Sequence, residues 1–212
     1  MRIALVNGSP KPTGSASGIL LKHLRASLSG QAELVDLALH SDSLPDGAWN
    51  TLQAADSYVF ACPLYVDGLP SHVLSCLVQL EERQTSGVPV YGIVNCGFYE
   101  GEQARYALDI LKNWCVRAGC RWSGGIGVGG GGSLAALAEI PPERGPMAPV
   151  GRALHAAASH ILRQEAFENQ YLSVGMPRLM YRMAAQLGWR KQLRANGGKR
   201  CDLGKKWGQN RL

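Results

Sequence analysis

A short stretch near the start of the chain combines the residue types that bind phosphate groups. NGSPKPTGSAS, residues 7–17, follows an apolar run and precedes a helix-like segment. Gly8 and Gly14 allow close backbone approach, and the helix that follows offers N–H groups and the positive end of its dipole. The side chains with hydroxyl groups are Ser9, Thr13, Ser15 and Ser17. The stretch therefore predicts a phosphate-binding loop.

The spacing of the glycines excludes two common nucleotide-binding patterns. A Walker motif needs four residues between its glycines and then Lys-Ser or Lys-Thr, whereas five residues separate Gly8 from Gly14, and Ser15 follows. The dinucleotide pattern G-x-G-x-x-G is also absent. Because Lys11 is the only nearby base, we expect a phosphomonoester held mostly by hydrogen bonds. The alternative is a capped turn without a ligand, since Ser, Thr and Gly are common at such turns.

Two later loops carry an apolar surface and a polar edge. Both follow β-rich runs, SYVFACP and VPVYGIVNC. The residues concerned are Pro63, Leu64 and Tyr65 in the first loop and Asn95, Gly97, Phe98 and Tyr99 in the second. The first set forms a rigid apolar shelf, and the second offers an amide, a backbone N–H and aromatic surface. Together with the hydroxyl-rich loop, they indicate a flat heteroaromatic ring with a tethered phosphate, as in FMN.

These loops have to lie at one edge of a sheet for the prediction to hold. The expected strands are 2–7, 32–37, 57–63, 88–96 and 120–128, and the expected helices are 17–28, 49–55, 71–83, 102–118 and 152–167. The runs that begin at Ile3, Tyr58 and Val88 are nearly continuous in apolar residues, which is typical of strands covered on both faces. The pattern predicts an α/β fold, a doubly wound five-stranded parallel sheet with helices on both faces. Ligands bind such sheets beyond the carboxyl ends of the strands.

Three motifs resemble those of the flavodoxin-like NAD(P)H-dependent FMN reductases and their multimeric flavodoxin relatives. They are N-G-S-P after the first strand, P-L-Y after the third and N-C-G-F after the fourth, and the resemblance covers residues 1–165. It implies that Ser9, Lys11, Thr13, Ser15, Ala16 and Ser17 lie at the phosphate, that Pro63, Leu64, Tyr65 and Val66 flank the ring, and that Asn95, Cys96, Gly97 and Phe98 approach its pyrimidine edge. Many members have Arg and then Asn in the first loop, where this chain has Lys11, Pro12 and Ser15.

The resemblance implies an FMN-dependent NAD(P)H oxidoreductase. Hydride would pass from the nicotinamide to bound FMN, and the electrons would leave to a small acceptor such as a quinone, a nitroaromatic compound, a metal ion or a flavin. No side chain has to act as a nucleophile, so no catalytic residue is assigned.

Two other functions stay open. A flavodoxin-type electron carrier would bind FMN but take electrons from a protein partner, and a binding module would hold another phosphate-bearing ligand. Carriers usually present an acidic face to basic partners, whereas residues 1–165 carry 12 Lys and Arg against 14 Asp and Glu, a net charge of only −2.

The charge of the chain is concentrated in its last quarter. Residues 166–212 carry 10 Lys and Arg against 2 Asp and Glu, a net charge of +8, so we expect a second region, a basic helical extension. Its segment 177–197 places Leu179, Met183 and Leu187 on one face. Such a helix can lie on an anionic membrane, bind an acidic partner or pack against its own or a neighbouring subunit. We expect a structural role or a homodimer or homotetramer contact, with membrane contact less favoured and no nucleic-acid partner.

The cysteines and His72 are expected to have structural roles, and the protein is expected to be cytoplasmic. The six cysteines have no C-x-x-C pair and no histidine-spaced partner, so we expect reduced thiols and no metal site. Cys96 is expected to be structural rather than redox-active, and His72 to be a surface or capping residue. The glycine-rich run 127–134 fits either a cradle for a second ligand or a mobile loop over the flavin. The sequence shows neither a secretory signal nor a membrane-length apolar segment.

Overall fold

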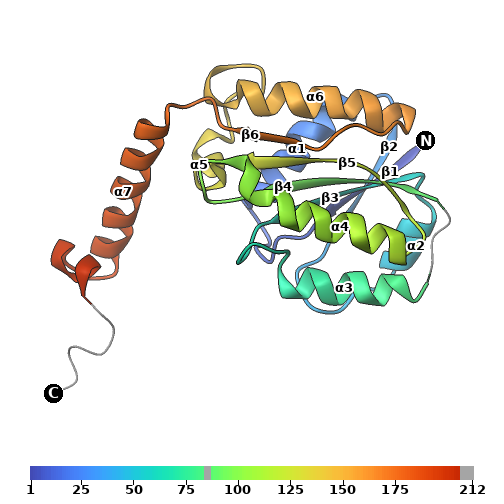
Figure 1. Cartoon of the computed structure of the whole chain (residues 1–212), viewed down its shortest axis with the longest axis horizontal. Helices are drawn as coiled ribbons and strands as arrows, with labels where there is room; N and C mark the ends of the chain where they lie inside the picture. Colours follow the sequence, from blue (N-terminus) through green and yellow to red (C-terminus); the bar gives the residue numbers. More distant parts are fainter. Residues whose placement is uncertain (84–86, 206–212) are drawn as a thin grey trace. The chain divides into compact units, whose positions relative to one another are not determined.

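The computed structural model describes residues 1–83 and 87–205, and the chain divides into two compact units, Met1–Gly175 and Met176–Leu212. The first unit is a sheet between two layers of helices (Figure 1). Its strands are β1 (Arg2–Asn7), β2 (Glu33–Ala38), β3 (Ser57–Pro63), β4 (Pro89–Asn95), β5 (Arg121–Gly129) and β6 (Gln170–Ser173). Its α-helices are α1 (Ala16–Leu28), α2 (Ala48–Gln53), α3 (Ser71–Glu81), α4 (Arg105–Arg117), α5 (Gly131–Leu137) and α6 (Ala148–Arg163), and its 3-10 helices are η1 (Gly101–Ala104) and η2 (Gly145–Met147).

The order of the strands creates a switch point next to β1. The sheet runs β2-β1-β3-β4-β5-β6, and all neighbouring strands are parallel. The chain passes from β1 outward to β2 and then returns to the other side of β1 for β3. At such a point the loops that follow the two central strands leave in opposite directions and open a crevice between them. The loops after β1 and β3 therefore meet where the sequence predicted the ligand.

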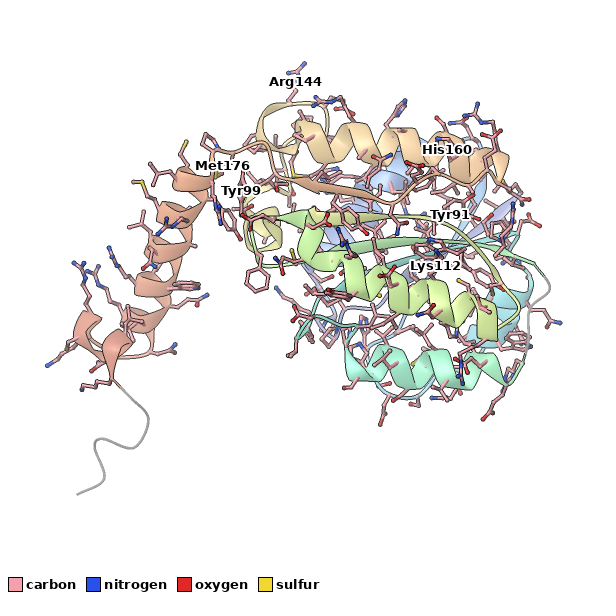
Figure 2. The ribbon with its side chains drawn as sticks, in the orientation of Figure 1. Tyr91, Tyr99, Lys112, Arg144, His160 and Met176 are labelled. Carbon is pink, nitrogen blue, oxygen red and sulfur yellow. The ribbon has the colours of Figure 1, made fainter. Side chains whose placement is uncertain are left out.

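Both faces of the sheet are buried because the central strands alternate large apolar side chains. Phe60 faces the layer of α3 and α4, where its ring meets Trp114 edge-on at a centroid distance of 5.5 Å. Tyr91 faces the opposite layer, and its hydroxyl donates to the carbonyl of Glu165 at 3.0 Å and lies 3.4 Å from that of His160 (Figure 2). The apolar runs of the sequence therefore correspond to strands covered on both sides.

The sheet has six strands, so the expectation of five was wrong. β6 pairs in parallel with β5, from Gln170 beside Ile126 to Ser173 beside Gly129. The strand is short and only partly buried, and its sequence QYLS lacks the apolar run that marks the central strands. Pairing with an already formed edge, rather than intrinsic β preference, explains its conformation. As a result, the first unit extends to Gly175, beyond the expected boundary at residue 165.

The second unit contains α7 (Arg178–Ala195) and the 3-10 helix η3 (Arg200–Gly204). Residues 176–212 carry 10 Lys and Arg against 1 Asp, a net charge of +9. None of the residues of α7, all of which are described, is buried. Within residues 1–83 and 87–205, no helix combines the length and the apolar character that a membrane span requires. Assembly into a dimer or tetramer stays a prediction.

Truncation at the two boundaries tests whether β6 belongs to the first unit. A chain ending at Gly175 loses no buried residue of α7, so its free energy of unfolding should stay within about 1 kcal/mol of the full chain. A chain ending at Glu165 loses β6, the buried Val174 and Phe167, whose ring stacks on Tyr91 at 5.9 Å. It should lose about 3 kcal/mol or more. Urea unfolding of both would show this, and equal stability would contradict the assignment.

A buried histidine makes the first unit sensitive to acid. His23 on α1 is 7% exposed, and its Nε2 atom has no hydrogen-bond partner among the described residues. Burial, and to a smaller extent Lys22, hold its pKa below the usual 6.5, while Glu143 and Glu139 act in the opposite direction. The folded state therefore favours the neutral ring. As the pH falls below 6.5, the ring of His23 binds a proton more readily in the unfolded chain than in the folded one. The free energy of unfolding therefore decreases below pH 6.5, and His23 causes no such loss above it.

His23→Leu tests this dependence. The substitution removes the titrating ring, so the free energy of unfolding should fall less steeply with acid than in the unsubstituted chain. The difference should be at most about 1.4 kcal/mol for each pH unit. Urea unfolding of both chains at pH values above and below 6.5 measures it. Parallel pH profiles would show that His23 makes no contribution.

Candidate functional site

The loop between β1 and α1 begins at a fixed point beside β3. The N–H of Gly8 donates to the carbonyl of Ala61 at 2.8 Å, which extends the pairing of the two strands by one residue. A Cβ atom at Gly8 would lie 2.5 Å from Cys62 Sγ, closer than Cβ atoms approach other atoms in proteins. Glycine is therefore required here by packing, and the loop leaves the sheet at a defined place.

Three of the expected phosphate-binding serines also hold the loop together. Ser9, Ser15 and Ser17 are buried, and each hydroxyl oxygen accepts one hydrogen bond. The donors are the backbone N–H of Lys11 at 3.2 Å, the backbone N–H of Gly18 at 3.0 Å and the side-chain amide of Asn95 at 2.8 Å. A hydroxyl group that accepts a bond still has its own proton to donate. The serines thus shape the loop and retain donor capacity.

The N-terminal end of α1 supplies the groups expected of an anion site. Ser15 caps the helix, and the N–H groups of Ala16 and Ser17 lie in the first turn, where an α-helix offers them no internal acceptor. Residues 16–19 carry no acidic side chain. Lys11 and Thr13 are exposed on the same loop, and Lys11 Nζ lies 3.3 Å from the carbonyl of Gly14. Helix dipole, hydroxyl groups and one lysine can together bind a phosphate.

The loop after β3 forms a tight turn that exposes two apolar side chains. Tyr65 and Gly68 exchange backbone hydrogen bonds of 2.9 and 3.0 Å. Between them, Val66 and Asp67 adopt left-handed conformations with φ of 47° and 59°. A β-branched residue seldom adopts this conformation, and such strain concentrates at functional sites. Tyr65 is 51% exposed and Val66 is fully exposed, so the turn presents an apolar surface of defined shape.

Asn95 at the end of β4 joins three elements. Its side-chain amide donates to Ser17 Oγ on α1 at 2.8 Å and to the carbonyl of Cys62 on β3 at 3.1 Å. Its backbone carbonyl accepts from the N–H of Leu64 at 2.7 Å, next to the partly buried Pro63. Both amide protons are used within the protein, although the sequence indicated that this amide would face a ring edge. The candidate contact at this strand end therefore shifts to the backbone beyond it.

The residues after Asn95 divide into a buried thiol and an exposed edge. Cys96 is buried, and its S–H lies 3.4 Å from the carbonyl of Glu100 and 3.7 Å from that of Phe98. Burial raises the pKa of the thiol, so Cys96 stays protonated, as befits a structural residue. A Cβ atom at Gly97 would have no heavy atom within 4 Å, and Phe98 is 58% exposed. Open space and an aromatic side chain lie together at this strand end.

The glycine-rich run packs the loop after β4 against β5 and α5. The N–H groups of Gly130 and Gly131 donate to the carbonyls of Phe98 and Cys96 at 2.6 and 2.7 Å. A Cβ atom at Gly129 would collide with the carbonyl oxygen of Tyr99, so a larger residue does not fit. Residues 127–130 and 134 of the run are buried, and the two roles considered for it from the sequence stay predictions. These contacts hold the loop that carries Gly97 and Phe98.

Two histidines contact the first loop, and sequence reasoning did not foresee either contact. His40, directly beyond β2, has its Nδ1 atom 2.7 Å from the carbonyl of Ser9, and His72, in the first turn of α3, has Nε2 3.1 Å from the carbonyl of Gly8. His72 therefore contacts the loop itself, whereas the sequence indicated a surface or capping residue. Both contacts join residues far apart in the chain, and no local pattern predicts them. No cluster of three or more potential metal ligands occurs in residues 1–83 and 87–205.

Comparison with solved structures identifies the fold of the chain. No family model matches the sequence, and no curated protein matches it. A solved structure of a flavodoxin, WrbA-like protein from Agrobacterium tumefaciens matches with a TM-score of 0.53 at 14% identity, over 77% of this chain and 98% of that one. The chain has a flavodoxin-like fold.

Two further structures share this fold. RosB with bound 8-demethyl-8-formylriboflavin-5'-phosphate matches with a TM-score of 0.57 at 13% identity, over 77% of this chain and 79% of that one. An FMN-dependent NADH-azoreductase from Bacillus anthracis in complex with FMN matches with a TM-score of 0.51 at 14% identity, over 76% of this chain and all of that one. The fold that the sequence motifs implied is thus confirmed, apart from the additional strand.

Asn95→Leu tests the junction of the three elements. It leaves Ser17 Oγ and the Cys62 carbonyl without their buried donor and should lower the free energy of unfolding by about 2 kcal/mol. Gly97→Ala is the matched control two residues later, because open space surrounds this position. It should change stability by less than about 0.5 kcal/mol. Urea unfolding measures both, and equal effects would refute the role of the Asn95 amide.

Proposed function

We propose that the chain is an FMN-dependent oxidoreductase that takes hydride from NAD(P)H and passes electrons to a small acceptor. One observation carries the proposal. The N-terminal end of α1 and the exposed side chains of Tyr65, Val66 and Phe98 all belong to loops that leave the carboxyl edge of the sheet beside its switch point. An anion site beside an apolar, partly aromatic surface suits a ring with a tethered phosphate.

The residues present fit FMN. The phosphate would lie at the start of α1, near Thr13, Lys11 and the N–H groups of Ala16 and Ser17. The dimethylbenzene and central rings would lie against Tyr65 and Phe98, since exposed aromatic surface gains free energy when another ring covers it. The space around Gly97 would admit the polar edge of the ring. Two solved structures with the same fold hold FMN and 8-demethyl-8-formylriboflavin-5'-phosphate, which supports this choice.

The protein would contribute binding and orientation to the reaction. Bound FMN supplies the chemistry, since it accepts a hydride and returns electrons to a second substrate. The loop after β1 would hold the phosphate, and the turn at Val66 and Asp67, with its left-handed conformations, would hold the apolar side chains in place beside the ring. The thiol of Cys96 takes no part, because it is buried and protonated. A small acceptor such as a quinone, a nitroaromatic compound, a metal ion or a flavin would bind beside the flavin ring after the nicotinamide has left.

An anaerobic titration of the full chain, reconstituted with FMN, tests the proposal. NADPH or NADH should bleach the flavin absorbance band rapidly, because a nicotinamide that reaches the ring would transfer hydride to it. Phe98→Ala should weaken FMN binding by about tenfold, since an exposed aromatic contact is lost. Val116→Ala, an exposed apolar residue of α4, is the matched control and should leave binding unchanged.

The outcomes separate the competing functions. Bound flavin that stays oxidised with both nucleotides would refute direct hydride transfer and favour an electron carrier reduced by a protein partner. Failure of the chain to bind FMN would refute the flavin site, and a module for another phosphate-bearing ligand would then be the better explanation. Loss of FMN binding in Val116→Ala as well would show that Phe98 has no specific role.

A further inference from the structure

Two histidines bind successive carbonyl groups at the start of the loop after β1. His40 Nδ1 lies 2.7 Å from the Ser9 carbonyl oxygen, and His72 Nε2 lies 3.1 Å from the Gly8 carbonyl oxygen. A carbonyl oxygen only accepts, so each ring donates through the nitrogen named. His40 is thus protonated on Nδ1 and His72 on Nε2. The two rings come from different parts of the chain, 31 and 64 residues away from the carbonyls they bind.

These bonds complete the fixation of two peptide units. The unit between Gly8 and Ser9 is held at its carbonyl by His72 and at its N–H by Asn7 Oδ1, which lies 3.1 Å from Ser9 N. The next unit leads into Pro10, which has no N–H, so its carbonyl is the one backbone group through which it can be held. His40 binds that carbonyl.

The orientation of these carbonyls decides whether the loop can accept an anion. A carbonyl oxygen carries partial negative charge, and one that pointed at a phosphate would repel it, whereas N–H groups attract it. Lys11 is the only cation of the loop, and it also lies within hydrogen-bond distance of the Gly14 carbonyl. Phosphate binding therefore depends on correctly turned dipoles more than on charge. Donors that hold the Gly8 and Ser9 carbonyls keep those dipoles in place.

We propose that His40 and His72 are positioning residues that give the site its preference for a phosphorylated flavin over an unphosphorylated one. The inference rests on the proposed flavin function. Riboflavin shares the ring of FMN but lacks the phosphate. Loss of the histidine bonds should therefore weaken FMN binding and leave riboflavin binding unchanged, because Tyr65, Val66 and Phe98 would contact only the ring.

Substitutions that keep or remove each donor test the proposal. His40→Leu and His72→Leu remove the donors, and each should raise the dissociation constant of FMN by about tenfold, the effect of one hydrogen bond. His40→Asn places an amide nitrogen close to the former Nδ1, and His72→Gln places one close to the former Nε2. These two variants should bind FMN within about threefold of the unsubstituted chain. The riboflavin dissociation constant should change by less than about twofold throughout.

Quenching of flavin fluorescence by the full chain measures both dissociation constants, and thermal unfolding of the flavin-free variants reports on the fold. If the leucine variants fail to fold, His40→Gln and His72→Asn replace them. In these variants the side-chain amide lies one bond farther from, or nearer to, the backbone than in His40→Asn and His72→Gln, so FMN affinity should fall while riboflavin affinity stays the same. Unchanged FMN affinity, or an equal loss for FMN and riboflavin, would overturn the proposal. Equal affinity of the unsubstituted chain for both flavins would overturn it and leave the flavin function standing. Failure to bind either flavin would refute both proposals.

Discussion

The buried amide of Asn95 is the contact on which the geometry of the candidate site depends. β3 and β4 end side by side, and the first turn of α1 lies next to both ends. The polar groups of these three segments therefore need partners at the same place. The amide donates to Ser17 Oγ and to the Cys62 carbonyl, while the backbone carbonyl of Asn95 accepts from Leu64. A buried polar group without a partner costs free energy, so all three segments are held at one spacing. The loops that leave these segments inherit that spacing.

The glycines on the other side of β4 set a second distance. Because Gly129 and Gly131 have no side chains, the loop after β4 lies close to the end of β5. The N–H groups of Gly130 and Gly131 then donate to the carbonyls of Phe98 and Cys96 in that loop. Gly101 is packed in the same way, since a Cβ atom there would collide with the backbone of β6. The additional strand thus closes the packing around the loop that exposes Phe98. A strand at the edge of the sheet thus contributes to the position of a candidate site residue.

The sequence was informative wherever local pattern and structure coincide. Continuous apolar runs such as Tyr58–Cys62 located the central strands, because burial on both faces requires such composition. The helix expected from residue 17 begins one residue earlier, at Ala16, with Ser15 as its N-cap. Long-range contacts carry no such signature. Neither the partners of Asn95 nor the bonds from His40 and His72 can be read from spacing, and β6 depends on the edge of β5 more than on its own residues.

The proposed anion site offers dipoles and a single lysine, so its donors have to be positioned accurately. A cluster of arginines attracts a phosphate over a range of geometries, because a charge acts in all directions. Hydroxyl groups and backbone N–H groups act only within a narrow angle. A loop with Lys11 as its sole cation must therefore hold each donor in register, and the buried serines, the amide of Asn95 and the two histidine rings all act on this loop or on the first turn of α1. The polar network around the loop is what the proposed recognition of an anion by dipoles and one lysine would require.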